Sequence, residues 1–149
     1  PEALSPQIKS TNFLNNILAK RESIAAGTFD SLFLNWKDEL TECTVSNLFF
    51  VSGKTLHTPA LDCGILDGIT RTIVMTLAQE EGIPVREGHY HLADLQRAEE
   101  CFLTNTSMEI MPVNRVDSFA IGDGRPGSLT RRLQTRFADS RTRFLEPTS

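Results

Sequence analysis

Apolar residues recur at helical spacing in three stretches of the chain. In STNFLNNILAKRESIAAG they fall three or four residues apart, with Ser10 or Thr11 as a cap and Gly27 as the end, which predicts a helix. In GILDGITRTIVMTLAQEEG they repeat every four residues and predict a second helix over 69–81. PGSLTRRLQTRF predicts a last helix, with Pro126 near its first turn.

Short apolar runs bounded by polar turns predict strands between these helices. DSLFLNWKDELTE indicates a strand, a turn over 36–39 and the start of a second strand, and SNLFFVSGKTLHTP indicates a strand, a turn over 52–54 and a return. IPVRE, CFLTN and MEIMPVNRV predict further strands, with a short helix over 91–98 and a turn over 122–124. This order of elements indicates a mixed α/β fold.

The composition narrows the class of protein. With 149 residues, 40% of them hydrophobic, the chain is long enough for one domain. A net charge of −4 argues against a general polyanion binder, and the five arginines of RRLQTRFADSRTRF are expected on a solvated helix face. Three cysteines without close spacing indicate neither a disulfide framework nor a zinc site, and no apolar run reaches the ~20 residues that span a membrane. We therefore expect a cytoplasmic protein.

The start of the second helix is a candidate anion site. Gly68, Ile69 and Thr70 form its first turn, where backbone N–H groups have no partner within the helix and lie at the positive end of the helix dipole. Such an end suits a phosphate. The alternative is an ordinary capped helix in which Asp67 or Thr70 satisfies these donors.

The stretch GDGRPG matches the G-x-G-x-x-G pattern of dinucleotide-binding turns. That pattern requires a following βαβ unit with an acidic residue about 20 positions on. Here the helix that follows runs into the end of the chain. We therefore interpret GDGRPG as a simple turn.

Four segments in order, IKSTNFLNNILAKRESIAAG, LTECTVSNLFFV, TPALDCGILDGITR and FLTNTSMEIMPVNRVD, resemble the C-terminal domain of the class IV (fold-type IV) pyridoxal-phosphate enzymes. This family includes branched-chain and D-amino acid aminotransferases and 4-amino-4-deoxychorismate lyase. The resemblance implies a curved sheet or pseudo-barrel flanked by helices, and a homodimer. It also implies that residues 1–149 are the cofactor-binding domain of a longer enzyme whose N-terminal domain is absent from this chain, which begins with Pro1 in an extended stretch.

The resemblance also implies two catalytic residues. Lys9, in IKSTNFL, matches the lysine that forms the imine with the cofactor aldehyde, and the freed amine can move a proton at the substrate α-carbon. Glu42, in TECTVSNLFF, matches the glutamate that pairs with the pyridine nitrogen of pyridoxal 5′-phosphate. Without the resemblance, Lys9 would be a surface lysine and Glu42 a solvent-facing acid of a turn.

The family's phosphate-binding residues match two segments. Gly68, Ile69 and Thr70 match the helix start that receives the cofactor phosphate, and Thr106, in TNTSMEIMPV, matches a second phosphate-binding threonine. Taken alone, Thr106 could equally be an interior strand threonine bonded to backbone. Arg71 is expected on the helix surface or at an interface, and the three histidines match no metal-ligand spacing.

Three functions stay open at this point. The family implies amino-group transfer between an amino acid, of branched-chain or D-amino acid type, and a 2-oxo acid. TSMEIMPV and GDGRPGSLTRRLQ are similar to the aminotransferases. TECTVSNLFF, TPALDCG and TNTSMEIMPV, with its second Met before Pro112, are also similar to the lyase, which releases pyruvate and 4-aminobenzoate. The third alternative is a non-catalytic binding or assembly module that keeps only the fold.

Overall fold

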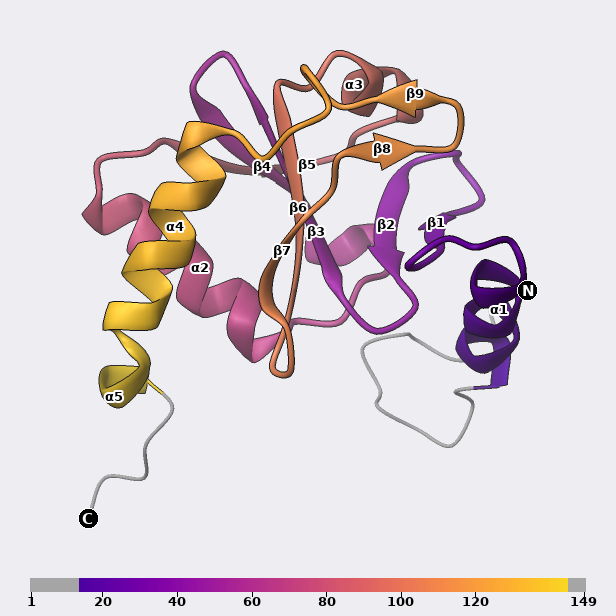
Figure 1. Ribbon diagram of the computed structural model, residues 1–149, viewed down its shortest axis with the longest axis horizontal. Coiled ribbons are helices and arrows are strands. Elements are labelled where there is room, and N and C mark those ends of the chain that lie inside the picture. The colour runs from indigo at the N-terminus through magenta and orange to yellow at the C-terminus, as the bar shows by residue number, and fades with distance from the viewer. Residues whose placement is uncertain (1–13, 145–149) are drawn as a thin grey trace.

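Strand β3 (Asn47–Ser52) is the centre of a seven-stranded sheet within residues 14–144, the part of the chain that the computed structural model describes (Figure 1). One edge of β3 pairs with β6 (Glu100–Asn105), and the other edge pairs with β2 (Leu40–Cys43) and β4 (Thr55–Pro59). These three pairings are antiparallel. The apolar runs predicted as strands therefore meet in one sheet.

The outer strands extend this sheet on both sides. Strand β1 (Leu32–Leu34) runs antiparallel to β2, and β7 (Glu109–Pro112) runs antiparallel to β6. Strand β5 (Val85–Gly88) is parallel to β4, and helix α2 (Ile69–Glu80) lies between them in the chain. A parallel pair needs such a crossover connection, because a tight turn cannot join its ends.

The predicted single strand MEIMPVNRV is wrong, because it is two strands. Strand β7 ends at Pro112, the last residue paired with β6. Proline has no N–H to continue the ladder, and the chain next forms a separate ribbon of β8 (Arg115–Val116) and β9 (Phe119–Ala120). The turn expected over 122–124 follows, and Gly122 and Gly124 both have positive φ there.

The predicted helices are present. They are α1 (Leu14–Ala25), α2, α3 (Leu92–Gln96) and α4 (Ser128–Asp139). The short helices η1 (Leu61–Cys63) and α5 (Arg141–Phe144) are present in addition. Pro126 lies near the first turn of α4, as predicted, because it directly precedes Gly127, the N-cap of that helix. A side chain at Gly127 would overlap Glu100, whose carboxylate accepts hydrogen bonds from the N–H groups of Leu129 and Thr130.

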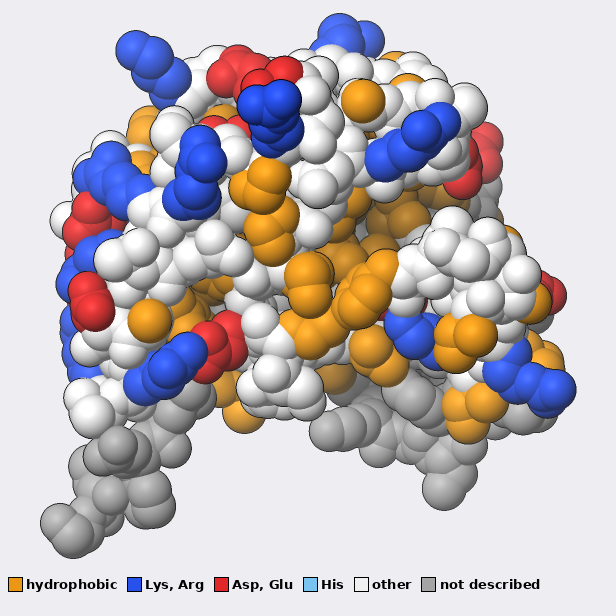
Figure 2. All heavy atoms as spheres, viewed as in Figure 1, with side chains coloured by type: hydrophobic (Ala, Val, Ile, Leu, Met, Phe, Trp, Pro, Cys, Tyr) orange, Lys and Arg blue, Asp and Glu red, His pale blue; other side chains and the backbone are white. Residues whose placement is uncertain are grey.

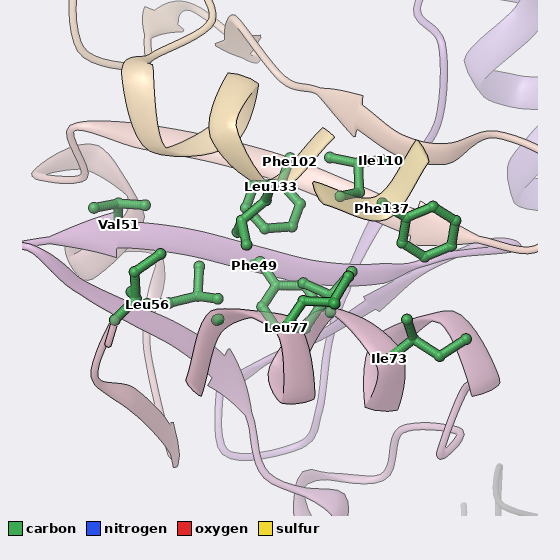
Figure 3. Close-up of a cluster of buried hydrophobic side chains, with 12 residues drawn as sticks. Phe49, Val51, Leu56, Ile73, Leu77, Phe102, Ile110, Leu133 and Phe137 are labelled. Carbon is green, nitrogen blue, oxygen red and sulfur yellow. The ribbon is translucent and has the colours of Figure 1, made fainter. Parts of the chain in front are cut away.

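The sheet has an apolar core on each face. On one face, Phe49 and Phe102 stack with ring centroids 5.1 Å apart, and α2 and α4 cover them with Leu77, Leu133 and Phe137 (Figure 3). The opposite face is covered by α3 and the β8–β9 ribbon, and its buried members are Leu40, Cys43, Leu48, Phe50, Leu95, Ala98, Cys101, Leu103 and Ile121. The fold is mixed α/β, with a mainly antiparallel sheet flanked by helices.

Four of the five arginines of the last helices are exposed, as expected, and Arg136 is partly buried; three of them form ion pairs with the end of α2. Arg132 and Arg136 contact Glu81, Arg143 contacts Glu80 at the end of α2, and these N–O distances are 2.7–2.8 Å. Exposed pairs of this kind contribute little each. Together they nevertheless fix which end of α2 lies beside α4.

An apolar groove opens between α1 and the start of the β8–β9 ribbon, where hydrophobic side chains are visible in a hollow of the surface (Figure 2). Its walls include Leu32, Leu48, Leu103, Met111 and Val113.

No helix among the described residues is long and apolar enough to cross a membrane. Cys43, Cys63 and Cys101 are buried free thiols.

Candidate active site

Three segments from distant parts of the chain meet at one end of the sheet (Figure 1). They are the β2–β3 turn at 44–46, the β6–β7 turn at 106–108 and the start of α2. The Asn105 side chain donates a hydrogen bond to the Val45 carbonyl (3.3 Å) and accepts two from the N–H groups of Ser107 and Met108. The two turns are thereby held to each other.

Glu42 points from β2 toward the start of α2. Its Oε2 accepts a hydrogen bond from the Leu66 N–H (3.0 Å) and one from the amide of Asn47 (3.2 Å). Asn47, opposite Glu42 in the β2–β3 ladder, also donates to the Leu66 carbonyl at 2.9 Å. The alternative of a solvent-facing acid is wrong, because Glu42 is half-buried in this network.

Burial raises the pKa of Glu42 to about 7, because removal from water disfavours the ionised carboxylate. The Leu66 N–H and the positive charge of Arg71 act in the opposite direction and offset only part of this effect. Within residues 14–144 both hydrogen bonds reach the same oxygen, Oε2. A cationic N–H placed at this carboxylate would favour the charged form, so the site suits a protonated ring nitrogen.

The start of α2 carries no side-chain cap. Its N-cap is Gly68, which makes no side-chain hydrogen bond, and the Asp67 carboxylate instead accepts bonds from the side chains of Arg71 and Thr72. The alternative of an ordinary capped helix is therefore wrong. The N–H groups of the first turn, Ile69 included, have no partners within the helix, and such a helix start suits an anion.

Gly68 allows a close approach between this helix start and β3. A Cβ at Gly68 would lie 2.2 Å from Oδ1 of Asn47, which is too close for any real contact. Since two hydrogen bonds already fix Asn47, its amide cannot easily rotate away. The bare backbone of Gly68 thus keeps Glu42, Asn47 and the start of α2 together.

Two threonine hydroxyls beside this end of the sheet are buried, and neither has a hydrogen-bond partner within the described part of the chain. They belong to Thr70, in the first turn of α2, and Thr104, opposite Asn47 in β6. Buried hydroxyls are nearly always paired in proteins, so the orphaned Thr70 hydroxyl fits a site built for an added acceptor. Thr106 is exposed in the β6–β7 turn, so the interior-strand alternative for it is wrong.

The sequence suggested that Arg71 lies on the helix surface or at an interface. A position on the helix surface is wrong, because Arg71 is only 2% exposed. Its guanidinium donates to the Pro59 carbonyl (3.2 Å) and to the Glu87 carboxylate (2.5 Å). These contacts join α2 to the ends of β4 and β5. The apolar stripe of α2 gave no sign of this, because the partners come from other segments.

Sequence reasoning missed Asn47 and the Leu66 N–H. Asn47 had a weak signal, since asparagine is uncommon inside a strand and here it opens the run NLFFV. The Leu66 N–H had none, because a backbone donor carries no sequence signature. Lys9 lies outside the described residues, and Glu42, Gly68, Ile69 and Thr70 lie at one end of the sheet, whose β6–β7 turn carries Thr106.

At this end of the sheet, an uncapped helix start, which suits an anion, lies near a half-buried carboxylate, which suits a basic nitrogen. The chain belongs to the class IV aminotransferase family, whose family model (Amino-transferase class IV) matches residues 1–116.

Relatives with different reactions are similar to this chain. It is 41% identical over 143 residues to a putative branched-chain-amino-acid aminotransferase of Methanocaldococcus jannaschii, covering 96% of this chain and 50% of that protein. It is 38% identical over 136 residues to the D-alanine aminotransferase of Listeria monocytogenes (91% and 47% covered). It is 35% identical over 128 residues to the aminodeoxychorismate lyase of Bacillus subtilis (86% and 43% covered).

A solved structure has the same fold. The branched-chain amino acid aminotransferase of Thermobaculum terrenum, crystallised in its PLP form, superposes with a TM-score of 0.88 at 37% identity, covering 92% of this chain and 45% of that one. The chain spans about half the length of the relatives it matches. Pyridoxal phosphate is thus implied by the family and by this neighbour.

Proposed function

We propose that residues 1–149 are the C-terminal cofactor-binding domain of a pyridoxal-phosphate enzyme that transfers an amino group between an amino acid and a 2-oxo acid. The observation that carries the proposal is the half-buried carboxylate of Glu42 beside the uncapped start of α2 with its orphaned Thr70 hydroxyl. Each is costly to the protein alone, and each would be satisfied by one end of the same cofactor.

At the ring end, Glu42 is proposed to hold a proton on the ring nitrogen. Leu66 and Asn47 orient the carboxylate through Oε2, and the nitrogen cation would favour its ionised form. Bound pyridoxal phosphate supplies an aldehyde and an electron-withdrawing ring. Glu42 would sustain that withdrawal by keeping the ring nitrogen protonated.

At the phosphate end, we expect the N–H groups of Ile69 and Thr70 and the hydroxyls of Thr70 and Thr106 to donate hydrogen bonds. Gly68 permits this, because its backbone approaches Asn47 more closely than any other residue could. Charge-assisted bonds of this type contribute about 1.5–3 kcal/mol each. The positive end of the α2 dipole adds to them.

Lys9 is proposed to attach the cofactor covalently and then to move the proton at the substrate α-carbon. A lysine does either only as the neutral amine, so its environment must favour that form at neutral pH. The position follows from the family resemblance of IKSTNFL, and Lys9 itself lies outside the described residues.

Borohydride trapping tests this proposal. The chain is incubated with pyridoxal phosphate, reduced, digested and mapped by mass spectrometry beside a Lys9→Ala control. We expect one labelled peptide containing Lys9, and none in the control. Labelling scattered over the exposed Lys37 and Lys54 would contradict the proposed site and leave a non-catalytic module as the better description.

Lyase activity is the second candidate, favoured by the similarity to the aminodeoxychorismate lyase of B. subtilis. Both reactions begin with removal of the α-proton, so the described residues serve either. Dependence of turnover on 2-oxoglutarate or pyruvate would support transfer, and pyruvate release from aminodeoxychorismate without an acceptor would support the lyase.

Homodimer formation and a cytoplasmic setting belong to the same proposal, and sedimentation of the chain checks the dimer.

A further inference from the structure

Glu39, Cys63 and His89 form a cluster at the opposite end of strand β2 from the β2–β3 turn. One ligand-type atom from each lies within 4.8 Å of the other two. The Nδ1 atom of His89 is 3.2 Å from Oε1 of Glu39 and 3.6 Å from the sulfur of Cys63. The three residues are at least 24 positions apart in the chain, which is why sequence spacing gave no metal signal.

The two separations measured from His89 Nδ1 fit one tetrahedral zinc ion. Zinc binds sulfur at about 2.3 Å and nitrogen or oxygen at about 2.0–2.1 Å, so a tetrahedral arrangement places ligand atoms about 3.3–3.6 Å apart. The observed 3.2 and 3.6 Å agree with this. A mixed sulfur, nitrogen and oxygen set also favours zinc over calcium or magnesium, which prefer oxygen alone.

The surroundings provide the outer support that metal ligands usually have. The other ring nitrogen of His89, Nε2, lies 3.1 Å from the Asp62 carboxylate, which would fix the tautomer that leaves Nδ1 free for a metal. The second oxygen of Glu39 accepts a hydrogen bond from Asn35 at 2.8 Å, and the same amide contacts the Cys63 carbonyl. The His89 and Glu39 side chains are thereby oriented by neighbouring groups, and the Cys63 thiol lies 3.6 Å from the Gly88 carbonyl.

Backbone bonds hold the three ligand segments in place. Leu40 donates to the Tyr90 carbonyl (2.7 Å), Ala60 to the Gly88 carbonyl (2.9 Å), and Asn35 to the Glu39 carbonyl (2.9 Å). Glu39 and Cys63 are buried, whereas the His89 side chain is 43% exposed. The cluster is therefore preformed and open to an ion from the His89 side.

We propose that Glu39, Cys63 and His89 bind one zinc ion, with water in the fourth position. The ion would brace the loop that runs from η1 to α2, because Cys63 begins that loop and Leu66 and Gly68 end it at the candidate active site. It would thus pin one end of the segment whose other end is bonded to Glu42 and Asn47.

Metal titration of the 149-residue chain tests the site without any cofactor. We expect one equivalent of Zn²⁺ to bind, and Co²⁺ to give a thiolate charge-transfer band. Cys63→Ser should abolish the band and His89→Gln should weaken binding at least tenfold. The matched controls Cys101→Ser, a buried cysteine of β6, and His91→Gln, an exposed histidine two residues away, should retain both.

X-ray absorption of the zinc-loaded wild-type chain keeps the proposal falsifiable where a variant fails to fold. One sulfur and two or three nitrogen or oxygen neighbours are expected, together with slower amide exchange over residues 60–68. A shell without sulfur, equal binding by all four variants, or no zinc bound at micromolar concentration would overturn the proposal. None of these outcomes depends on pyridoxal phosphate, so they are separate from the test of Lys9.

Discussion

The Asn47 amide bridges the Glu42 carboxylate and the Leu66 carbonyl, donating to Oε2 of Glu42 at 3.2 Å and to Leu66 at 2.9 Å. One strand residue therefore positions an acid on the neighbouring strand and the loop between η1 and α2. The Glu42 carboxylate also accepts a hydrogen bond from the Leu66 N–H. These three hydrogen bonds hold Glu42, Asn47 and Leu66 together.

The pH dependence of stability should report Glu42. Its folded pKa of about 7 lies above the ordinary 4.5, so the unfolded chain releases this proton first as the pH rises. The free energy of unfolding of the cofactor-free chain should fall by about 3 kcal/mol between roughly pH 4.5 and 7 and then level off. Urea unfolding at several pH values measures this.

Glu42→Gln should remove that slope, whereas Glu22→Gln, at an exposed position of α1, should keep it. An unchanged slope in Glu42→Gln would mean that another group causes the dependence. In the cofactor-bound enzyme, we expect the same variant to keep some binding and to lose most of the turnover, because glutamine cannot hold a proton on the ring nitrogen.

Thr70→Val should separate binding from stability. Since the Thr70 hydroxyl has no partner among the described residues, its removal should leave the free energy of unfolding within about 0.5 kcal/mol of wild type. Cofactor affinity should fall roughly tenfold or more. Thr76→Val, on the same helix with its hydroxyl bonded to the Thr72 carbonyl, is the control that should bind normally.

Loss of both Thr70 and Thr106 should weaken cofactor retention further. Equilibrium dialysis of the Thr70→Ala/Thr106→Ala variant measures this loss. If the double variant holds pyridoxal phosphate as tightly as wild type, the phosphate is bound elsewhere.

Gly68→Ala should be costly because of Asn47. The new Cβ would meet Oδ1 of Asn47 at 2.2 Å, so we expect a loss of about 1–3 kcal/mol in stability and weaker cofactor binding. In an Asn47→Ala background the same change should cost clearly less, because the clashing atom is gone. Strictly additive losses in this double-mutant cycle would contradict the proposed contact.

Arg71→Met should destabilise the chain by about 1–3 kcal/mol, since it leaves the Pro59 carbonyl and the Glu87 carboxylate without their donor. Arg97→Met, which removes an exposed ion pair with Asp94, should change stability by less than about 0.5 kcal/mol. Thermal unfolding of the two variants compares them. Similar melting temperatures would show that the Arg71 contacts contribute nothing net.

The sequence allowed the prediction of most elements because their signals are local. The helical spacing of α2 and the apolar runs of β3 and β6 are properties of short segments, and all three are present. The missed features depend on segments far apart in the chain. Burial of Arg71 needs Pro59 and Glu87, and the division of MEIMPVNRV needs the register that ends at Pro112.

The candidate site likewise has residues that sequence motifs predict and contacts that depend on segments far apart in the chain. Family motifs marked Lys9, Glu42, Gly68, Ile69, Thr70 and Thr106, because a motif records side chains at fixed positions. The Asn47 bridge and the Leu66 N–H became evident only once β2, β3 and the loop before α2 were placed together. The cluster of Glu39, Cys63 and His89 had no sequence signal for the same reason.

The bond from Asn105 to the Val45 carbonyl has a mechanical consequence. Because this hydrogen bond joins the β6–β7 turn to the β2–β3 turn, the turn that carries Thr106 and the hairpin that carries Glu42 cannot shift independently. A ligand bound by one turn would therefore also restrict the motion of the other. Phosphate binding at Thr106 would thus reduce the mobility of the hairpin that carries Glu42.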